Sequence, residues 1–144
     1  MRPIVMLFVA VLAPCAGCSM RAPVPSIEVR DAWARPADSA ATTAAYFTVL
    51  NHEKATVTLQ SESSPFAGSV SLHESMEMDG MAHMMPVTAP VAIAAADSLV
   101  LKAGARHLMV MELTRRLTAG DSLPLLLRFT DGRDVRAVAI VRAP

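Results

Sequence analysis

Apolar and polar residues alternate in short stretches along residues 27–141, and none of these stretches has a convincing helical period. We expect strands at residues 27–33, 43–50, 57–60, 69–74, 81–87, 98–102, 106–113, 122–130 and 135–141. Short strands at such spacing are typical of a sandwich or barrel. The pattern therefore predicts an all-β fold, a Greek-key barrel or sandwich, in which Trp33 is a core aromatic of the first strand.

Two Asp-Gly pairs mark hairpin turns between predicted strands. Asp131-Gly132 separates the last two strands, and Asp79-Gly80 separates the fourth from the fifth. Such pairs favour two-residue turns, because glycine and, to a lesser degree, aspartate tolerate positive φ. Pro124 lacks the N–H that a sheet ladder needs, so we expect its strand to lie at an edge or to start there.

A two-residue turn at 79–80 determines which side chains share a face of that hairpin. Ser75 then lies opposite Met84, and His73 lies opposite Pro86. His73 and Met84 become diagonal neighbours on one face, about 7–8 Å apart or less, which long side chains can bridge. The other face carries a second group of sulfur and imidazole side chains: Met76, Met78, Met81 and His83.

The composition singles out the same part of the chain. Residues 73–111 contain three of the four histidines and seven of the ten methionines. Methionine usually fills gaps in cores and is spread through a sequence, so this concentration is unusual. His107 and Met109 lie two residues apart on one predicted strand and therefore share a face. With His73 and Met84 they form a candidate set of two imidazole and two thioether ligands.

This candidate set suits a soft, monovalent metal ion, which we predict to be Cu(I). Thioether sulfur is polarizable and uncharged, whereas Zn(II), Mg(II) and Ca(II) prefer imidazole with carboxylate or other oxygen ligands. Both cysteines, Cys15 and Cys18, lie near the start of the chain, so the domain has no thiolate for a zinc or blue-copper site. Thioethers also carry no proton, so they bind metal in acid better than histidine does.

The first 18 residues have the features of a targeting segment. Arg2 precedes an apolar stretch at residues 4–13 that is too short to span a bilayer. Ala16-Gly17-Cys18 resembles the end of a bacterial lipobox, with Cys18 as the lipidated first residue of the mature protein, although Cys15 departs from that pattern. A soluble exported protein is the alternative. We expect three parts: a signal peptide at 1–18, a proline-rich tether at 19–26 and one copper-binding domain at 27–142.

The charge balance argues against several classes of function. The chain has 13 basic and 13 acidic residues, a formal net charge of zero and no long basic run. Nothing indicates nucleic acid or an anionic membrane surface as a partner, so we expect membrane contact only through a lipid anchor. No serine–histidine–aspartate or paired-carboxylate motif stands out, and we do not expect an enzyme.

The ligand spacing and its surroundings resemble the periplasmic copper chaperones of the PCu(A)C family. Ten residues separate His73 from Met84, as in that family, and 22 separate Met84 from His107-Leu108-Met109, where the family has about twenty-one. Flanking segments match as well: D-A-W-A-R-P at 31–36, A-A-Y-F at 44–47, S-S-P-F-A-G at 63–68, H-E at 73–74, M-M-P-V at 84–87 and H-L-M-V-M at 107–111. The extra residue falls in the alanine-rich connection at 89–97, where a loop absorbs it.

This resemblance implies a cupredoxin-like β-barrel that binds one Cu(I) ion near its surface through His73, Met84, His107 and Met109. It implies a monomeric copper metallochaperone of the periplasm or cell envelope. It also implies delivery of copper to the copper centres of cytochrome c oxidase, either directly to an oxidase subunit or through a thiol-bearing copper chaperone. A surface site suits transfer, because an acceptor thiolate must approach before the donor releases the ion.

Three alternatives remain open at this stage. Met85 could replace Met84 as the ligand, although side-chain alternation directs it to the other face. The remaining hairpin residues could hold an auxiliary metal ion or form an ordinary solvated loop: Met76, Met78, Met81, His83 and Met85. The protein could instead buffer copper or confer copper resistance, or it could be a non-metal β-sandwich interaction module, which leaves the clustering of methionine and histidine unexplained.

Overall fold

The computed structural model describes residues 25–143, which form ten β-strands. They are β1 (Ile27–Ala34), β2 (Thr43–Asn51), β3 (Val57–Ser63), β4 (Ala67–Met78), β5 (Met81–Pro86), β6 (Val91–Ile93), β7 (Ser98–Leu101), β8 (Arg106–Leu113), β9 (Ser122–Phe129) and β10 (Asp134–Val141). Within this range no helix has the length and apolar character needed to cross a membrane. The predicted signal peptide, Cys18 and most of the tether lie outside the described residues.

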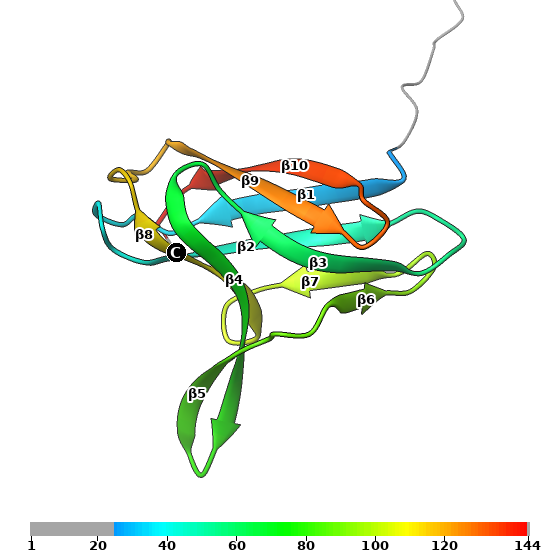
Figure 1. The fold of residues 1–144 in the computed structure, drawn as a ribbon. Helices are drawn as coiled ribbons and strands as arrows, with labels where there is room; N and C mark the ends of the chain where they lie inside the picture. Colours follow the sequence, from blue (N-terminus) through cyan, green and yellow to red (C-terminus); the bar gives the residue numbers. More distant parts are fainter. Residues whose placement is uncertain (1–24, 144) are drawn as a thin grey trace, which may run out of the picture.

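Across residues 25–143 the strands form one sheet, in the order β5-β4-β8-β2-β1-β10-β9-β3-β6, with β7 also paired to β2. Among the strands that the structure describes, only β1 and β10 pair in parallel; the other pairs are antiparallel. Figure 1 shows these strands wrapped around one interior. The fold is therefore all-β as predicted, and the hydrogen-bonded path stays open between its ends, β5 and β6.

Alternation along the strands determines which side chains form the core. In β9 every second residue is buried, and the second half of β10 follows the same rule. Burying one leucine or phenylalanine side chain stabilises a fold by about 1.5–3 kcal/mol. The buried residues of these two strands join a single cluster with those of the others: Leu123, Leu125, Leu127, Phe129, Ala137, Ala139 and Val141.

Asn51 is a polar side chain inside this core, with only 2% of its surface exposed. Its Nδ2 group donates to the carbonyl oxygens of Ala55, Ile93 and Ala94 at 2.8, 3.1 and 2.9 Å. Its Oδ1 atom accepts the N–H of Glu53 at 3.0 Å. One amide thus joins the end of β2 to the last residue of β6 and to the residue that follows it.

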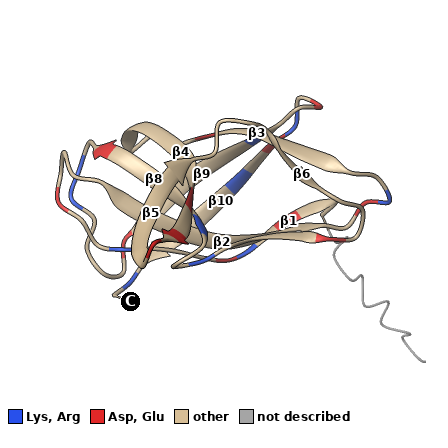
Figure 2. Cartoon of the chain, turned by 90° about the horizontal axis from the view of Figure 1, so that it is seen from below, with Lys and Arg blue, Asp and Glu red and all other residues tan. Residues whose placement is uncertain are grey.

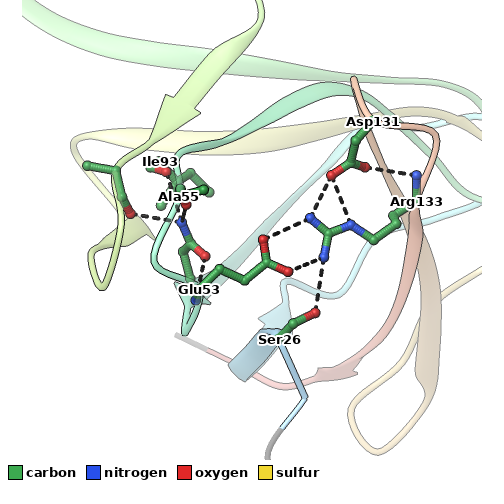
Figure 3. Close-up of polar contacts among 8 residues, drawn as sticks. Ser26, Glu53, Ala55, Ile93, Asp131 and Arg133 are labelled. Carbon is green, nitrogen blue, oxygen red and sulfur yellow. Dashed lines mark hydrogen bonds and ion pairs between the residues drawn. The ribbon is translucent and has the colours of Figure 1, made fainter.

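Glu53, which is bonded to Asn51, also belongs to a cluster of ion-paired side chains on the surface. Figure 3 shows the Arg133 side chain between Glu53, Asp131 and Ser26. The Arg133 Nη2 group donates to Asp131 Oδ2 at 2.6 Å, and Nη1 donates to Ser26 Oγ at 3.1 Å. These contacts join the β9–β10 turn to the start of β1 and the end of β2.

The β4–β5 hairpin extends out of the body of the domain (Figure 1). All six residues of β5 are exposed, and so are the last three of β4. Asp79 and Gly80 have φ values of 53° and 74°, as a two-residue type I′ turn requires. The predicted turn is confirmed, and it sets the register of every residue in the hairpin.

The strand predictions from alternation are confirmed to within a few residues, with exceptions where the residues are polar or small. β3 and β4 extend beyond the predicted ends, because their polar residues still pair through the backbone, as in Glu62 with Leu127. The short strand β6 was missed, since it lies in the alanine-rich connection and pairs only with β3.

The expectation for Pro124 was wrong at the level of the whole strand. β9 lies between β10 and β3, so it is an interior strand rather than an edge. However, β3 pairs only with residues 126–129 of β9. Pro124 precedes that segment, so its missing N–H breaks no β3 ladder bond.

Charged residues are dispersed over the domain. Figure 2 shows basic and acidic positions interspersed over loops and strands rather than gathered on one side. This mixture fits the balanced total of 13 basic and 13 acidic residues.

Candidate metal site

The centre of the candidate site is the ladder between β4 and β8. Antiparallel pairing places His73 directly opposite His107, with ring centroids 6.2 Å apart. Leu72 and Leu108 point into the core, with 3% and 0% of their surface exposed. Because side chains alternate along a strand, both histidines point to the other face of the sheet.

The two predicted thioether ligands lie on the same face as the histidines. Met109 pairs with Ser71, two residues from His73, so it is a diagonal neighbour of that histidine. Met84 pairs with Ser75, two residues from His73 on the other side. The predicted hairpin register is therefore confirmed, and the four candidate side chains come from β4, β5 and β8.

A surface pocket of about 360 Å³ opens beside these residues. Met84, His107 and Met109 line it, together with Tyr46 and Arg35 among others. His73 is not part of its lining, but its ring lies 6.2 Å from that of His107, centroid to centroid. His107 is 5% exposed, whereas Met84 is 62% exposed, so the site has a buried side and an open side.

Hydrogen bonds define which nitrogen atoms are available for a metal. His107 Nδ1 lies 2.9 Å from the carbonyl oxygen of Ala105, which can only accept, so this nitrogen carries the proton. The lone pair of a neutral His107 is then on Nε2. His73 Nε2 lies 3.0 Å from Ser71 Oγ, and this hydrogen bond must be replaced if that nitrogen is to bind an ion.

The surroundings of His73 favour the neutral form of its imidazole ring. Burial, and then the nearby His107, lower the pKa of this imidazole below its ordinary value. The neutral ring, which is the form that coordinates metals, is thereby favoured.

An aromatic row runs from the candidate site across the sheet, and the sequence pattern did not identify it. Tyr46 lies 6.3 Å from the His107 ring, and Trp33 lies 4.5 Å from Tyr46, centroid to centroid. Arg142 covers Trp33 with its guanidinium 4.7 Å from the ring centroid. Trp33 is only half-buried, so its interpretation as a core residue was wrong. The segments D-A-W-A-R-P and A-A-Y-F that contain these aromatics were the available signal.

The remaining hairpin residues lie on the opposite face. Met76 pairs with His83, and Met78 pairs with Met81, as the predicted register requires. Met85 is also on this side, opposite Glu74. None of the five methionine and histidine residues lines the pocket beside His107. Glu74 pairs with Arg106 at 3.3 Å on that same face.

The donor set differs from that of a hard-ion site. In residues 25–143, no group of three or more His, Asp or Glu side chains lies close enough to hold a metal ion. The candidate set instead combines two imidazole rings with two uncharged thioethers, which is the donor chemistry that soft cations prefer.

The chain matches one known family and several solved structures over nearly its whole described length. A family model described as "Putative lipoprotein LpqE-like" matches residues 27–141. The curated protein "Putative lipoprotein Lxx21020" of Leifsonia xyli subsp. xyli is 31% identical over 132 residues, which cover 85% of this chain and 79% of that protein.

Two solved structures share the fold. CuI-DR1885 from Deinococcus radiodurans, solved in solution, is 30% identical with a TM-score of 0.60, covering 90% of this chain and 86% of that one. The apo PCuAC domain from PmoF1 is 22% identical with a TM-score of 0.68, covering 85% of this chain and 98% of that one. The cupredoxin-like fold implied by the resemblance is confirmed by these neighbours.

Proposed function

Since this chain belongs to the LpqE-like family and has the fold of PCuAC domains, we propose that it is a Cu(I)-binding metallochaperone of the cell envelope. The observation that carries the proposal is the face shared by His73, Met84, His107 and Met109 beside one open pocket. A relative 30% identical to this chain is named as a Cu(I) form, which supports the choice of ion.

The ligand chemistry supports a monovalent ion. Two neutral imidazoles and two thioethers bring no negative charge to the site. A divalent cation would lose its hydration shell there without gaining an anionic partner, whereas Cu(I) binds thioether sulfur well. His107, with its Nδ1 proton held by Ala105, would present Nε2 to the ion without reorienting.

The unequal exposure of the ligands supports transfer rather than storage. Met84 is the most exposed of the four and sits on the projecting hairpin, whereas His107 is almost fully buried. An acceptor thiolate could replace the Met84 sulfur first, while the deeper ligands still hold the ion. The copper stays in the Cu(I) state throughout such a ligand exchange, so no reductant is needed.

Anaerobic Cu(I) titration against a competing chelator, combined with X-ray absorption, tests the binding site. The first equivalent should have nitrogen and sulfur neighbours, two of each, and the His107→Ala variant should lose it. Met111→Leu is the matched control, because Met111 shares the face but lies one step further from His73. Equal affinity in wild type and His107→Ala would disprove the proposed site.

For the destination of the copper, we propose the copper centres of cytochrome c oxidase, reached directly or through a thiol-bearing copper chaperone. The resemblance to the PCu(A)C family supports this assignment. Deleting the gene should lower oxidase activity, and added copper should restore it. Copper sensitivity with normal oxidase activity would instead support envelope copper buffering.

We also propose that Cys18 is lipidated and anchors the domain to a membrane. The names of the family and of its curated relative support this step. Wild-type protein should incorporate radiolabelled fatty acid and remain with membranes after salt washing, while Cys18→Ser should do neither. Equal labelling of both would rule out Cys18 as the attachment site.

A further inference from the structure

The face of the β4–β5 hairpin that points away from His73 has its own group of ligand side chains. We call it the outer face and define it by Met76, Met78, Met81 and His83. The backbone register makes two adjacent cross-strand pairs of these residues, Met76 with His83 and Met78 with Met81. Directly opposite side chains have Cβ atoms about 4.5–5.5 Å apart, and diagonal ones about 7–8 Å or less. The four donor side chains therefore project from four neighbouring positions of one β-ladder.

These methionines are not core residues. Met76, Met78 and Met81 are 45%, 51% and 61% exposed. Among the residues that the structure describes, eight large hydrophobic side chains are exposed, and five of them are the methionines of this hairpin. Isolated exposed apolar residues are ordinary, but a contiguous group marks a binding surface of some kind.

From this arrangement we propose that Met76, Met78, Met81 and His83 bind a second Cu(I) ion. Three thioethers and one imidazole form a soft, uncharged donor set, and the flexible methionine side chains can converge from neighbouring ladder positions. The type I′ turn at Asp79 and Gly80 holds the two pairs in register before any ion arrives. The choice of Cu(I) rests on the proposed function, whereas the position of the site does not.

The carboxylates nearby do not convert the outer face into a hard-ion site. Glu74 shares this face, but its carboxylate is paired with Arg106. Glu77 lies opposite Ala82, on the side of the hairpin that carries Met84. Mg(II) and Ca(II) need several oxygen ligands, which this set of side chains does not supply.

The outer-face site and the His107 site use opposite faces of β4 and β5, so neither shares a ligand with the other. The outer-face site projects furthest from the body and is open to water, with one imidazole rather than two. We therefore expect it to bind Cu(I) more weakly than the His107 site. This order of affinity would let the hairpin tip capture an ion and pass it inward.

Anaerobic Cu(I) titration of three full-length proteins tests the inference. Wild type should bind two equivalents. The outer-face variant, with Met76→Leu, Met78→Leu, Met81→Leu and His83→Ala, should bind one, and Met85→Leu should still bind two. A His107→Ala, Met109→Leu variant should keep one equivalent, whose X-ray absorption shows mainly sulfur neighbours.

The outcomes separate failure of this inference from failure of the proposed function. One equivalent in both wild type and the outer-face variant overturns the second site alone. The first site alone is overturned by a different pair of results. The His107→Ala, Met109→Leu variant would then bind as much Cu(I) as wild type, and the outer-face variant would bind none. Because all four outer-face positions are exposed, these substitutions should leave the circular dichroism spectrum and the thermal midpoint unchanged.

Discussion

His73 and His107 face each other across the β4–β8 ladder, and their ring centroids are 6.2 Å apart. Thirty-three residues separate them in the sequence, so only strand pairing brings them together. Met84 and Met109 are diagonal neighbours of His73 on either side, which makes His73 the centre of the candidate ligand set.

Removing the Ser71 hydroxyl should strengthen Cu(I) binding. Ser71 Oγ is 3.0 Å from His73 Nε2, and a hydroxyl that donates there occupies the lone pair that the metal needs. A hydrogen bond of this kind contributes about 0.5–1.5 kcal/mol, so Ser71→Ala should raise Cu(I) affinity by about two- to tenfold. Chelator competition measures this change. Lower affinity would mean that Ser71 Oγ accepts a hydrogen bond from the Nε2–H group and that His73 binds copper through Nδ1.

The metal-free protein should lose stability in mild acid through His73. Its pKa is lowered by burial and by His107, so the unfolded chain takes up this proton at a higher pH than the folded one does. This contribution to the free energy of unfolding is complete above about pH 6.5 and decreases as the pH falls toward the folded-state pKa. Urea unfolding between about pH 5 and 7.5 measures it. A His73→Gln variant should show a flatter dependence, and an identical slope would exclude His73 as the cause.

Met84 and Met85 should respond differently to the same substitution. Both are exposed, at 62% and 53%, but they point to opposite faces of β5. Met84→Leu should reduce Cu(I) affinity at the His107 site by about tenfold or more, since even indirect partners of metal ligands cost that much. Met85→Leu should leave it unchanged. A loss confined to Met85→Leu would reverse the assignment of the ligand.

Replacing Asn51 should destabilise the domain without changing its metal chemistry. Asn51→Ala leaves the carbonyls of Ala55, Ile93 and Ala94 without their donor inside the core. An unsatisfied buried group costs about 1–3 kcal/mol, so we expect a loss of about 2–4 kcal/mol in chemical denaturation. Cu(I) affinity measured well below the unfolding midpoint should match wild type. A loss below about 0.5 kcal/mol would mean that water replaces the amide.

Much of the site could be predicted because it depends on local rules. Asp79-Gly80 determines a turn with positive φ, the turn determines the register, and the register determines that His73 and Met84 share a face. Likewise His107 and Met109 share a face because they are two residues apart.

The remaining features of the site depend on which strands pair with one another, and the alternation of apolar and polar residues carries no information about strand pairing. The pairing of β8 with β4 on one side and β2 on the other brings Tyr46 to His107, and no local pattern links those residues. The same reason explains why Trp33 was wrongly predicted to be a core residue. Its neighbours Tyr46 and Arg142 come from distant segments of the chain. The edge prediction for Pro124 failed because β3 pairs with residues 126–129 of β9. Only the first residues of β9, which include Pro124, lack a partner on that side.

The exposure of Met84 makes its sulfur atom sensitive to oxidants. A sulfur atom that an acceptor can reach is also within reach of peroxide and hypochlorous acid. Its sulfoxide is polar and lacks the soft thioether donor that the proposed Cu(I) site requires. Under the proposed function, oxidation of Met84 should therefore lower the Cu(I) affinity of the domain, and reduction of the sulfoxide should restore it.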